Sequence, residues 1–427
     1  MADKQIPHLV YADSEGNIYD EPDLLMLVRR GRELSLPRPD EIMPLPDASD
    51  LFMLPGRKAV GFDPETGRTE VIDNGLALAG FASPGHTLSA TAAFVRGENP
   101  PVLPLFAYGA LGYMGGRFWI TSMLVDKDQR QNFAGISQSR IAKGAKSLLR
   151  KYPDNRLIRH LAGCALDYCC PAARNLALGR FEAPLPTSRQ CNASCIGCIS
   201  LQPRDSGFVS TQNRMDFAPT AEEISQVMLE HCSREPRAIL SFGQGCEGEP
   251  LTMARTIAES VKRVRRAIPR ATINMNTNAS RPEHIQELAR AGMDSIRVSL
   301  NSADPELYRL YFRPRNYDFE DVRRSISLAR EEGMFVSLNL LYFPGITDTE
   351  DELDRITGLL EDQRVNLVQL RNLNLDPDIY LRLLTDKSPG PQVGLKNFMR
   401  RIRKQCPWIK FGYFNPYLPK DAGGKQC

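Results

Sequence analysis

Beyond Phe181 the chain alternates strand-like and helix-like segments as far as about residue 376, and this alternation limits the possible folds more than any other feature. Six short segments are predicted to be strands: 183–188, 237–242, 271–278, 294–300, 335–342 and 366–371. Helical stretches begin between them, near Ala221, Leu251, Pro282, Phe319 and Asp348. Successive βα units form a parallel sheet, either open or curled into part of a barrel. Because ligands bind beyond the carboxyl ends of such strands, the residues that follow each strand are the first site candidates.

The residues before this region have a different pattern. Alternating apolar runs at 58–63 and 69–74 flank a turn at 64–67 and predict a hairpin within a β-rich region. From Ile136 apolar residues recur at helical spacing, which predicts one or two amphipathic helices. We therefore expect an α/β chain with four parts: a β-rich N-terminal accessory domain (1–135), a helical connection (136–180), the βα region (181–376) and a short C-terminal extension (377–427).

Three cysteines follow the first predicted strand of the βα region: Cys191, Cys195 and Cys198. Three thiolates within eight residues can converge on one metal centre. Four cysteines would complete a zinc or cluster cage, whereas three leave an iron with an open coordination position. A structural zinc site that takes its fourth ligand from elsewhere is the alternative interpretation.

At this Cys-x3-Cys-x2-Cys motif the sequence resembles the radical S-adenosylmethionine (radical SAM) superfamily, whose members carry the motif after the first strand of a partial (β/α)6 TIM-like barrel. The resemblance covers about residues 181–376 and implies the same barrel here. It implies a [4Fe–4S] cluster, with the amino and carboxylate groups of S-adenosylmethionine (SAM) on the fourth iron. The catalytic cluster ligands that it implies are Cys191, Cys195 and Cys198. Gly197 departs from the family, which usually has an adenine-packing aromatic residue there, so Ile196 or Ile199 is expected to supply that contact.

The resemblance also implies a reaction. An electron from a low-potential donor such as flavodoxin or ferredoxin would cleave SAM to methionine and a 5′-deoxyadenosyl radical, which abstracts hydrogen from a substrate. We expect that substrate to be either a peptide or protein, recognised by the N-terminal domain, or a small metabolite in a closed barrel mouth. The alternative from another functional class is a zinc- or cluster-bearing scaffold without catalysis.

The segment after the second predicted strand resembles the family's Gly-Gly-Glu-Pro motif, which receives the methionine ammonium group. It comprises Gly248, Glu249 and Pro250, with Glu247 in place of the first glycine. The same stretch forms a G-x-G-x-x-G pattern at 243–248, which would favour a dinucleotide-dependent oxidoreductase. That fold needs an acidic residue at the end of the next strand, where this chain has Asn278, so we disfavour it.

Polar residues end the third and fourth predicted strands. By resemblance they hold the ribose hydroxyls and the methionine carboxylate: Asn276, Asn278, Ser299 and Asn301. Local turn hydrogen bonds are the alternative role for such residues. After the fifth strand, the segment that ends at Ile346 resembles the one whose backbone meets adenine.

Two arginines are candidates for binding anions. Arg297 shares a strand face with Ser299 and could pair with a carboxylate, or it could be a structurally paired residue. The sixth strand ends in a polar series that we predict to face substrate: Arg371, Asn372 and Asn374. Arg371 would bind a carboxylate or phosphate, whereas the alternative is that the series only caps the sheet.

Of the 10 cysteines, three more lie close together before the triplet: Cys164, Cys169 and Cys170. The others are scattered: Cys232, Cys246, Cys406 and Cys427. Because adjacent cysteines on a helix point in different directions, at most one of Cys169 and Cys170 would share a face with Cys164. We therefore predict a single cluster, with free thiols elsewhere, and we assign the five histidines no role.

Charge and hydropathy exclude several partners. The 54 basic and 51 acidic residues give a net charge of +3, which indicates no general affinity for nucleic acid or membrane surfaces. No apolar stretch is long enough to span a bilayer, and the first ten residues contain no hydrophobic signal region. We expect a cytoplasmic protein.

Overall fold

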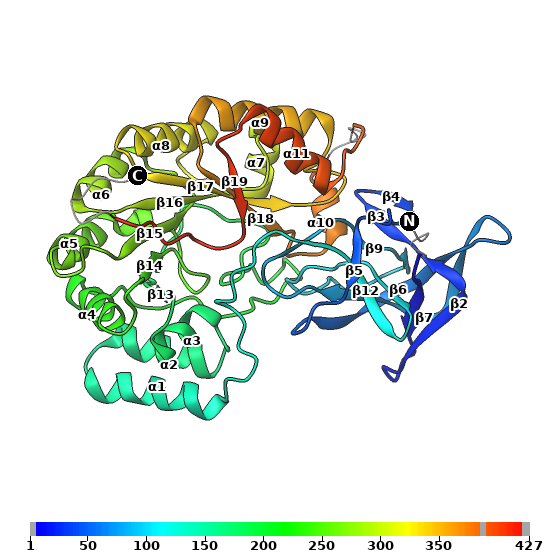
Figure 1. Cartoon of the computed structure of the whole chain (residues 1–427), viewed down its shortest axis with the longest axis horizontal. Helices are drawn as coiled ribbons and strands as arrows, with labels where there is room; N and C mark the ends of the chain where they lie inside the picture. Colours follow the sequence, from blue (N-terminus) through cyan, green and yellow to red (C-terminus); the bar gives the residue numbers. More distant parts are fainter. Residues whose placement is uncertain (1–5, 385–389, 421–427) are drawn as a thin grey trace.

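The computed structural model describes residues 6–384 and 390–420, and it shows an antiparallel N-terminal region beside a parallel α/β region (Figure 1). Cys427 lies outside the described residues. The N-terminal strands are β1 (His8–Ala12), β2 (Ile18–Met26), β3 (Val28–Arg30), β4 (Glu33–Ser35), β5 (Ile42–Pro44), β6 (Asp50–Asp63), β7 (Arg68–Phe81), β8 (His86–Leu88), β9 (Thr91–Ala92), β10 (Val95–Arg96), β11 (Leu111–Met114) and β12 (Arg117–Leu124). The predicted hairpin is present as β6 and β7, in which Asp63 faces Arg68 across the turn.

The helical connection contains three helices: α1 (Gln138–Lys151), α2 (Arg156–Leu166) and α3 (Pro171–Leu178). Ser137 begins α1 and Asn155 begins α2, because each side chain accepts a hydrogen bond from a backbone N–H of the first turn. Cys169, with φ 53°, and Cys170 lie in the turn between α2 and α3, so the expectation that they extend a helix with Cys164 is wrong.

All six predicted strands of the βα region are present and parallel, in sequential order. They are β13 (Glu182–Pro184), β14 (Ile239–Phe242), β15 (Thr272–Thr277), β16 (Ser295–Leu300), β17 (Phe335–Tyr342) and β18 (Leu367–Asn372). A seventh strand, β19 (Lys410–Gly412), pairs in parallel with β18. The predicted C-terminal extension (377–427) thus contributes β19 to the sheet.

Helices connect these strands and cover the outside of the sheet (Figure 1). They are α4 (Ala221–Cys232), α5 (Ala254–Val264), α6 (Ile285–Ala291), α7 (Pro305–Phe312), α8 (Phe319–Glu331), α9 (Glu350–Gln363), α10 (Pro377–Leu381) and α11 (Leu395–Gln405), with short 3₁₀ turns η1 (Pro250–Met253) and η2 (Pro282–His284). One large hydrophobic cluster unites this sheet with its helices.

The parallel sheet curls into part of a barrel. Asn415 donates from Nδ2 to the Glu182 carboxylate of β13 at 2.8 Å and accepts at Oδ1 from Gln369 of β18 at 3.2 Å. In a flat sheet, strands five places apart would be about 24 Å from each other. A single asparagine can contact both strands only because the sheet bends around it.

The N-terminal region packs on the carboxyl ends of β17 and β18. The backbone N–H of Gly31 donates to the Pro344 carbonyl at 2.8 Å, and the Thr87 hydroxyl donates to the Leu370 carbonyl at 3.2 Å. The buried Arg57 guanidinium lies 2.6 Å from the Asp376 carboxylate. These contacts close one side of the barrel mouth.

In the described part of the chain, no helix combines the length and apolar character needed to cross a bilayer.

Candidate active site

The cysteine loop, residues 188–198, follows β13 and is held by the end of α7. The backbone N–H groups of Ser194 and Ile196 donate to the carbonyls of Phe312 and Tyr311 at 3.0 and 3.1 Å. Carbonyls in the last turn of a helix have no partner within the helix, so the cysteine loop satisfies two of them. Arg315, just beyond α7, also donates to the Cys191 carbonyl at 2.7 Å.

A second loop, residues 243–250, lies directly against the cysteine loop; we call it the glutamate loop. The N–H of Gly248 donates to the Ser188 carbonyl, and that of Glu249 donates to the Gln190 carbonyl, each at 2.7 Å. The segment predicted to bind SAM is therefore fixed to the segment that carries the three cysteines.

The three predicted ligands Cys191, Cys195 and Cys198 are brought close together. Burial raises the pKa of Cys191 to about 11, and burial together with the neighbouring Cys191 and Cys198 sulfurs raises the pKa of Cys195 well above its usual value. The Arg214 guanidinium lies 3.4 Å from Cys198 Sγ. Three adjacent, partly buried sulfurs are a donor set that fits an iron–sulfur cluster.

Two buried carboxylates shape the glutamate loop. Glu249 accepts hydrogen bonds from the N–H of Leu251 and Asn278, at 3.0 and 2.8 Å, and from the Thr277 hydroxyl at 2.5 Å. Burial raises its pKa to about 7. Glu249 thus ties the ends of β14 and β15 together.

Glu247 has an equivalent role on the other side of the loop. Its carboxylate accepts from the N–H of Thr187 and Ser188, at 2.7 and 2.9 Å, and from that of Gln244 at 2.7 Å. Burial raises the pKa of Glu247 to about 7 as well. The residue that replaces the family's first glycine therefore braces the start of the cysteine loop.

Gly197 departs from the family pattern for a steric reason. A Cβ at this position would lie 2.5 Å from the Tyr311 hydroxyl and 3.1 Å from Leu375, so a side chain would fit only if Tyr311 moved. Ile196 is buried, whereas Ile199 approaches the glutamate loop, 2.6 Å from where a Cβ of Gly245 would lie. Their contact with adenine stays a prediction.

The predicted asparagines at the end of β15 are already hydrogen-bonded. Asn276 donates to the Gly243 carbonyl at 2.9 Å, and Asn278 donates to the Asn192 side chain at 2.9 Å. Asn278 therefore connects β15 to the cysteine loop, and both asparagines lie beside the glutamate loop.

At the end of β16, Ser299 is partly accessible and Asn301 is buried. Asn301 donates to the Leu307 carbonyl and the Tyr380 hydroxyl, each at 3.2 Å, but its Oδ1 has no hydrogen-bond partner among the described residues. Ile346, after β17, is buried against the N-terminal region, 3.4 Å from where a Cβ of Gly31 would lie.

Arg297 and Arg371 project from β16 and β18, and neither forms a salt bridge within the described part of the chain. Arg297 donates to Gln369 Oε1 at 3.3 Å, and its buried Nε has no partner there. Burial and the nearby Arg371 charge lower the pKa of Arg297. The Arg371 guanidinium lies 3.8 Å from the centre of the Tyr413 ring. The Glu182 carboxylate acts on the Arg297 charge in the opposite sense, without forming a salt bridge. Two neighbouring cations that form no salt bridge can bind an anion.

The other two predicted substrate residues, Asn372 and Asn374, differ in the part of the structure that they contact. Both ends of the Asn372 amide are used: Oδ1 accepts from the N–H of Leu88 at 2.8 Å, and Nδ2 donates to the His86 carbonyl at 3.1 Å. Asn372 thus joins β18 to the N-terminal region instead of presenting a free amide to substrate. Asn374 Oδ1 lies 3.4 Å from where a Cβ of Gly197 would be, beside the cysteine loop.

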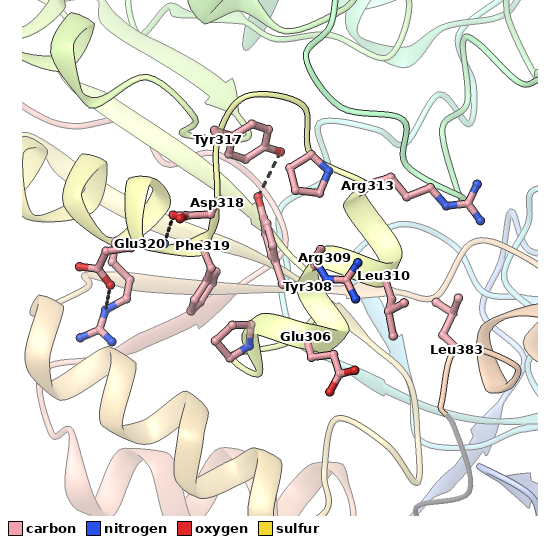
Figure 2. A pocket seen from close by; sticks show the side chains of 13 residues that line it. Glu306, Tyr308, Arg309, Leu310, Arg313, Tyr317, Asp318, Phe319, Glu320 and Leu383 are labelled. Carbon is pink, nitrogen blue, oxygen red and sulfur yellow. Dashed lines mark hydrogen bonds and ion pairs between the residues drawn. The ribbon is translucent and has the colours of Figure 1, made fainter.

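A separate cavity of about 890 Å³ lies between α7 and α8 (Figure 2). The hydroxyls of Tyr308 and Tyr317 meet there at 3.3 Å, while acidic and basic side chains such as Glu306 and Arg313 line the rest. Sequence reasoning missed α7 altogether, although Asp304 followed by Pro305 is an N-cap signal that could have indicated it.

Comparison with known proteins agrees with the cysteine motif. Residues 185–356 match the family model described as the Radical SAM superfamily. A GTP 3′,8-cyclase of Petrotoga mobilis is 26% identical over 197 residues, which cover 46% of this chain and 52% of that protein. A probable GTP 3′,8-cyclase of Thermococcus kodakarensis is 30% identical over 178 residues, covering 40% and 52%. The chain thus spans about half the length of these curated relatives.

Among solved structures, SuiB of Streptococcus suis bound to SAM aligns with 63% of this chain and 62% of that protein. The identity is 13% and the TM-score 0.37. At this level the likeness carries no argument about function.

Proposed function

Because this chain belongs to the radical SAM superfamily of enzymes, which use a [4Fe–4S] cluster and SAM, we propose that Cys191, Cys195 and Cys198 ligate the cluster. When bound and reduced, the cluster would supply the one electron that cleaves SAM to methionine and a 5′-deoxyadenosyl radical, which would abstract hydrogen from the substrate. The observation that carries the proposal is the backbone bonding between Glu249 and Gln190, which joins the cysteine loop to the glutamate loop.

The glutamate loop and the strand ends hold SAM in this proposal. Gly248, Glu249 and Pro250 receive the methionine ammonium group, for which the buried Glu249 carboxylate provides a negative charge. Asn276, Asn278, Ser299 and Asn301 surround the ribose and methionine carboxylate. The unpartnered Oδ1 of Asn301 supports this role, because a buried acceptor without a donor costs free energy that a ligand donor would recover. The backbone of the segment that ends at Ile346 contacts the adenine.

The substrate that the mouth of the barrel favours is a small anion. Arg297 and Arg371 supply positive charge and form no salt bridge in the described structure, and the N-terminal region covers the ends of β17 and β18. Two relatives bear the name GTP 3′,8-cyclase, so a nucleoside triphosphate is the first compound to test. Asn374, beside the cysteine loop, would then contact the substrate near the reacting carbon.

Label transfer tests this proposal. The anaerobically reconstituted enzyme would be incubated with SAM, a reductant and GTP deuterated on the ribose, and 5′-deoxyadenosine would be analysed by mass spectrometry. Deuterium in 5′-deoxyadenosine is the expected result, and Arg371→Ala should raise the substrate KM at least about tenfold. Arg403→Ala is the matched control, because Arg403 also stacks on an aromatic ring but lies on α11.

If SAM is cleaved but no nucleotide transfers deuterium, the nucleotide assignment is wrong while the SAM chemistry stands. Enzymes of this superfamily need a reductant, and we propose flavodoxin or ferredoxin as its source. Replacing dithionite by reduced flavodoxin should therefore sustain SAM cleavage and give the same products.

A further inference from the structure

A second group of sulfur and nitrogen ligands lies behind the glutamate loop. His160 and Cys164 are one turn apart on α2, so they share a face of the helix. Cys246, in the glutamate loop, completes the group: His160 Nε2 lies 3.4 Å from Cys246 Sγ and 3.5 Å from Cys164 Sγ. All three atoms are within 4.8 Å of one another.

These distances match those around a single tetrahedral ion. With zinc bonds of about 2.3 Å to sulfur and 2.0–2.1 Å to nitrogen, tetrahedral geometry separates a nitrogen from a sulfur ligand by about 3.6 Å. Both sulfurs are buried, with 3% and 5% of each cysteine exposed, while His160 is partly accessible. The set of one imidazole and two thiolates is a common zinc donor set.

The group also opens onto a cavity of about 700 Å³. His160 and Cys164 line this cavity together with Asp167 of the α2 terminus and Arg214, the residue that contacts Cys198. Three protein ligands occupy three tetrahedral positions, and the cavity gives a water molecule or small ligand access to the fourth. This arrangement is typical of a zinc site with an exchangeable position rather than of a closed structural site.

We propose that His160, Cys164 and Cys246 bind one zinc-class divalent ion whose fourth position faces this cavity. The site uses none of the proposed cluster ligands, so it goes beyond the proposed function. The bound ion joins α2, which carries His160 and Cys164, to the glutamate loop, in which Cys246 lies two residues before Gly248. Sequence spacing does not reveal the site, since Cys246 lies 82 positions after Cys164.

Cobalt binding tests the site independently of SAM chemistry. The full-length chain with Cys191, Cys195 and Cys198 all changed to Ala, freed of metal under reducing conditions, would be titrated with Co²⁺. We expect one ion per chain, with sulfur-to-cobalt charge-transfer absorption and the intense visible bands of tetrahedral cobalt. One equivalent of Zn²⁺ should abolish both signals.

Variants assign the ligands. Adding Cys164→Ser, Cys246→Ser or His160→Gln should weaken Co²⁺ binding at least about 100-fold. Loss of a direct metal ligand lowers metal affinity more than loss of a residue that only hydrogen-bonds to a ligand. Cys169→Ser is the matched control, because Cys169 is exposed in the adjoining turn and should leave binding unchanged. Circular dichroism checks folding, and the partly accessible His160 provides a variant that leaves the core intact.

Four results would overturn the proposal. The first is a cobalt spectrum without sulfur charge transfer, and the second is unchanged binding in Cys246→Ser. The third is iron near eight per wild-type chain that falls to four when Cys164 and Cys246 are replaced, which would show an auxiliary cluster instead. A disulfide between these two cysteines, detected by mass spectrometry in reduced and metal-loaded protein, would also contradict it.

Discussion

Gly248 lies directly on the backbone of Gln190, so that a Cβ at position 248 would fall 1.9 Å from the Gln190 carbonyl oxygen. Such a contact cannot exist without movement of one of the two loops. We predict that Gly248→Ala separates them and lowers both iron content and SAM affinity, measured by iron analysis and by equilibrium binding.

Gly358→Ala is the control for that substitution. Gly358 lies in α9 with nothing within 4 Å of the place that a Cβ would take, and alanine favours helices by about 1 kcal/mol. This variant should keep full iron content and gain slight stability. Normal iron content and SAM affinity in Gly248→Ala would contradict the account of the two loops.

Glu249 is expected to bind the methionine ammonium group, so Glu249→Ala should weaken SAM binding by about 1.5–3 kcal/mol, or roughly 10- to 100-fold, while the cluster content stays largely intact. The substitution also leaves the N–H groups of Leu251 and Asn278 without an acceptor, so some loss of stability is expected as well. Calorimetric titration of the folded fraction measures the affinity.

Asp294→Asn is the control that separates the loss of SAM affinity from the loss of stability. Asp294 is likewise buried and accepts from the N–H of Ile273 at 2.8 Å, but at the opposite end of β15. It should lose stability without any change in SAM affinity. Equal SAM affinity in Glu249→Ala and the wild type would show that the motif is misassigned.

The ion pair between Arg57 and Asp376 fastens the N-terminal region to the barrel. Only 1% of the Arg57 side chain and 3% of the Asp376 side chain are exposed. Arg57→Ala leaves the Asp376 carboxylate buried and unpaired, so it should lower the free energy of unfolding by about 3–5 kcal/mol. Urea unfolding measures the loss, and faster proteolysis within the N-terminal region should accompany it.

The neighbouring Lys58 provides the comparison. Its ion pair with Asp73, at 3.2 Å, is on the surface, where such pairs contribute little. Lys58→Ala should therefore unfold like the wild type. Similar stability of the two variants would mean that the buried pair does not fasten the N-terminal region.

The contact between α2 and α4 should weaken in acid. Glu223 accepts from the Arg156 side chain at 2.9 and 2.7 Å, which lowers its pKa from 4.5 to about 2. A lowered pKa in the folded state stabilises the fold above pH 4.5, and this contribution disappears as the pH falls to about 2. Because 45% of the Arg156 side chain is exposed, solvent screening limits the contribution to about 1–2 kcal/mol.

Chemical unfolding of the wild type and Glu223→Gln at several pH values tests this. The wild type should be more stable at pH 7, and the difference should shrink toward zero as the pH falls below 4. A difference that does not depend on pH would assign the effect to packing rather than to charge.

The parallel sheet could be predicted because strand-like segments alternate regularly with helical ones along the sequence. In the central strands β15, β16 and β17, apolar residues alternate with polar ones. The short strand β19 was missed, since three residues carry no usable period and its place depends on β18. Thr220 and Glu223 form the capping box that their spacing indicates. Ser280 and Glu283 have the same spacing, but the Ser280 hydroxyl accepts from Asn192 of the cysteine loop instead, so a tertiary contact replaces the local cap.

Some residues of the candidate site could likewise be predicted from the sequence, and others could not. The three cysteines are visible in the sequence because they are local, and so is the segment at 248–250. The residues that hold the cysteine loop, such as Tyr311 and Arg315, come from α7 and the turn after it, more than a hundred positions later. Likewise, only the fold places Cys246 beside Cys164.

The central claim is that Cys191, Cys195 and Cys198 hold a cluster that cleaves SAM, and one anaerobic assay tests it most directly. Reconstituted protein would be mixed with SAM and dithionite, and 5′-deoxyadenosine and iron would be measured for the wild type and each Cys→Ala variant. We predict about four iron atoms per wild-type chain, together with 5′-deoxyadenosine formation that each of the three substitutions abolishes. Zinc in place of iron at the triplet, with no SAM cleavage by the wild type, would contradict the account.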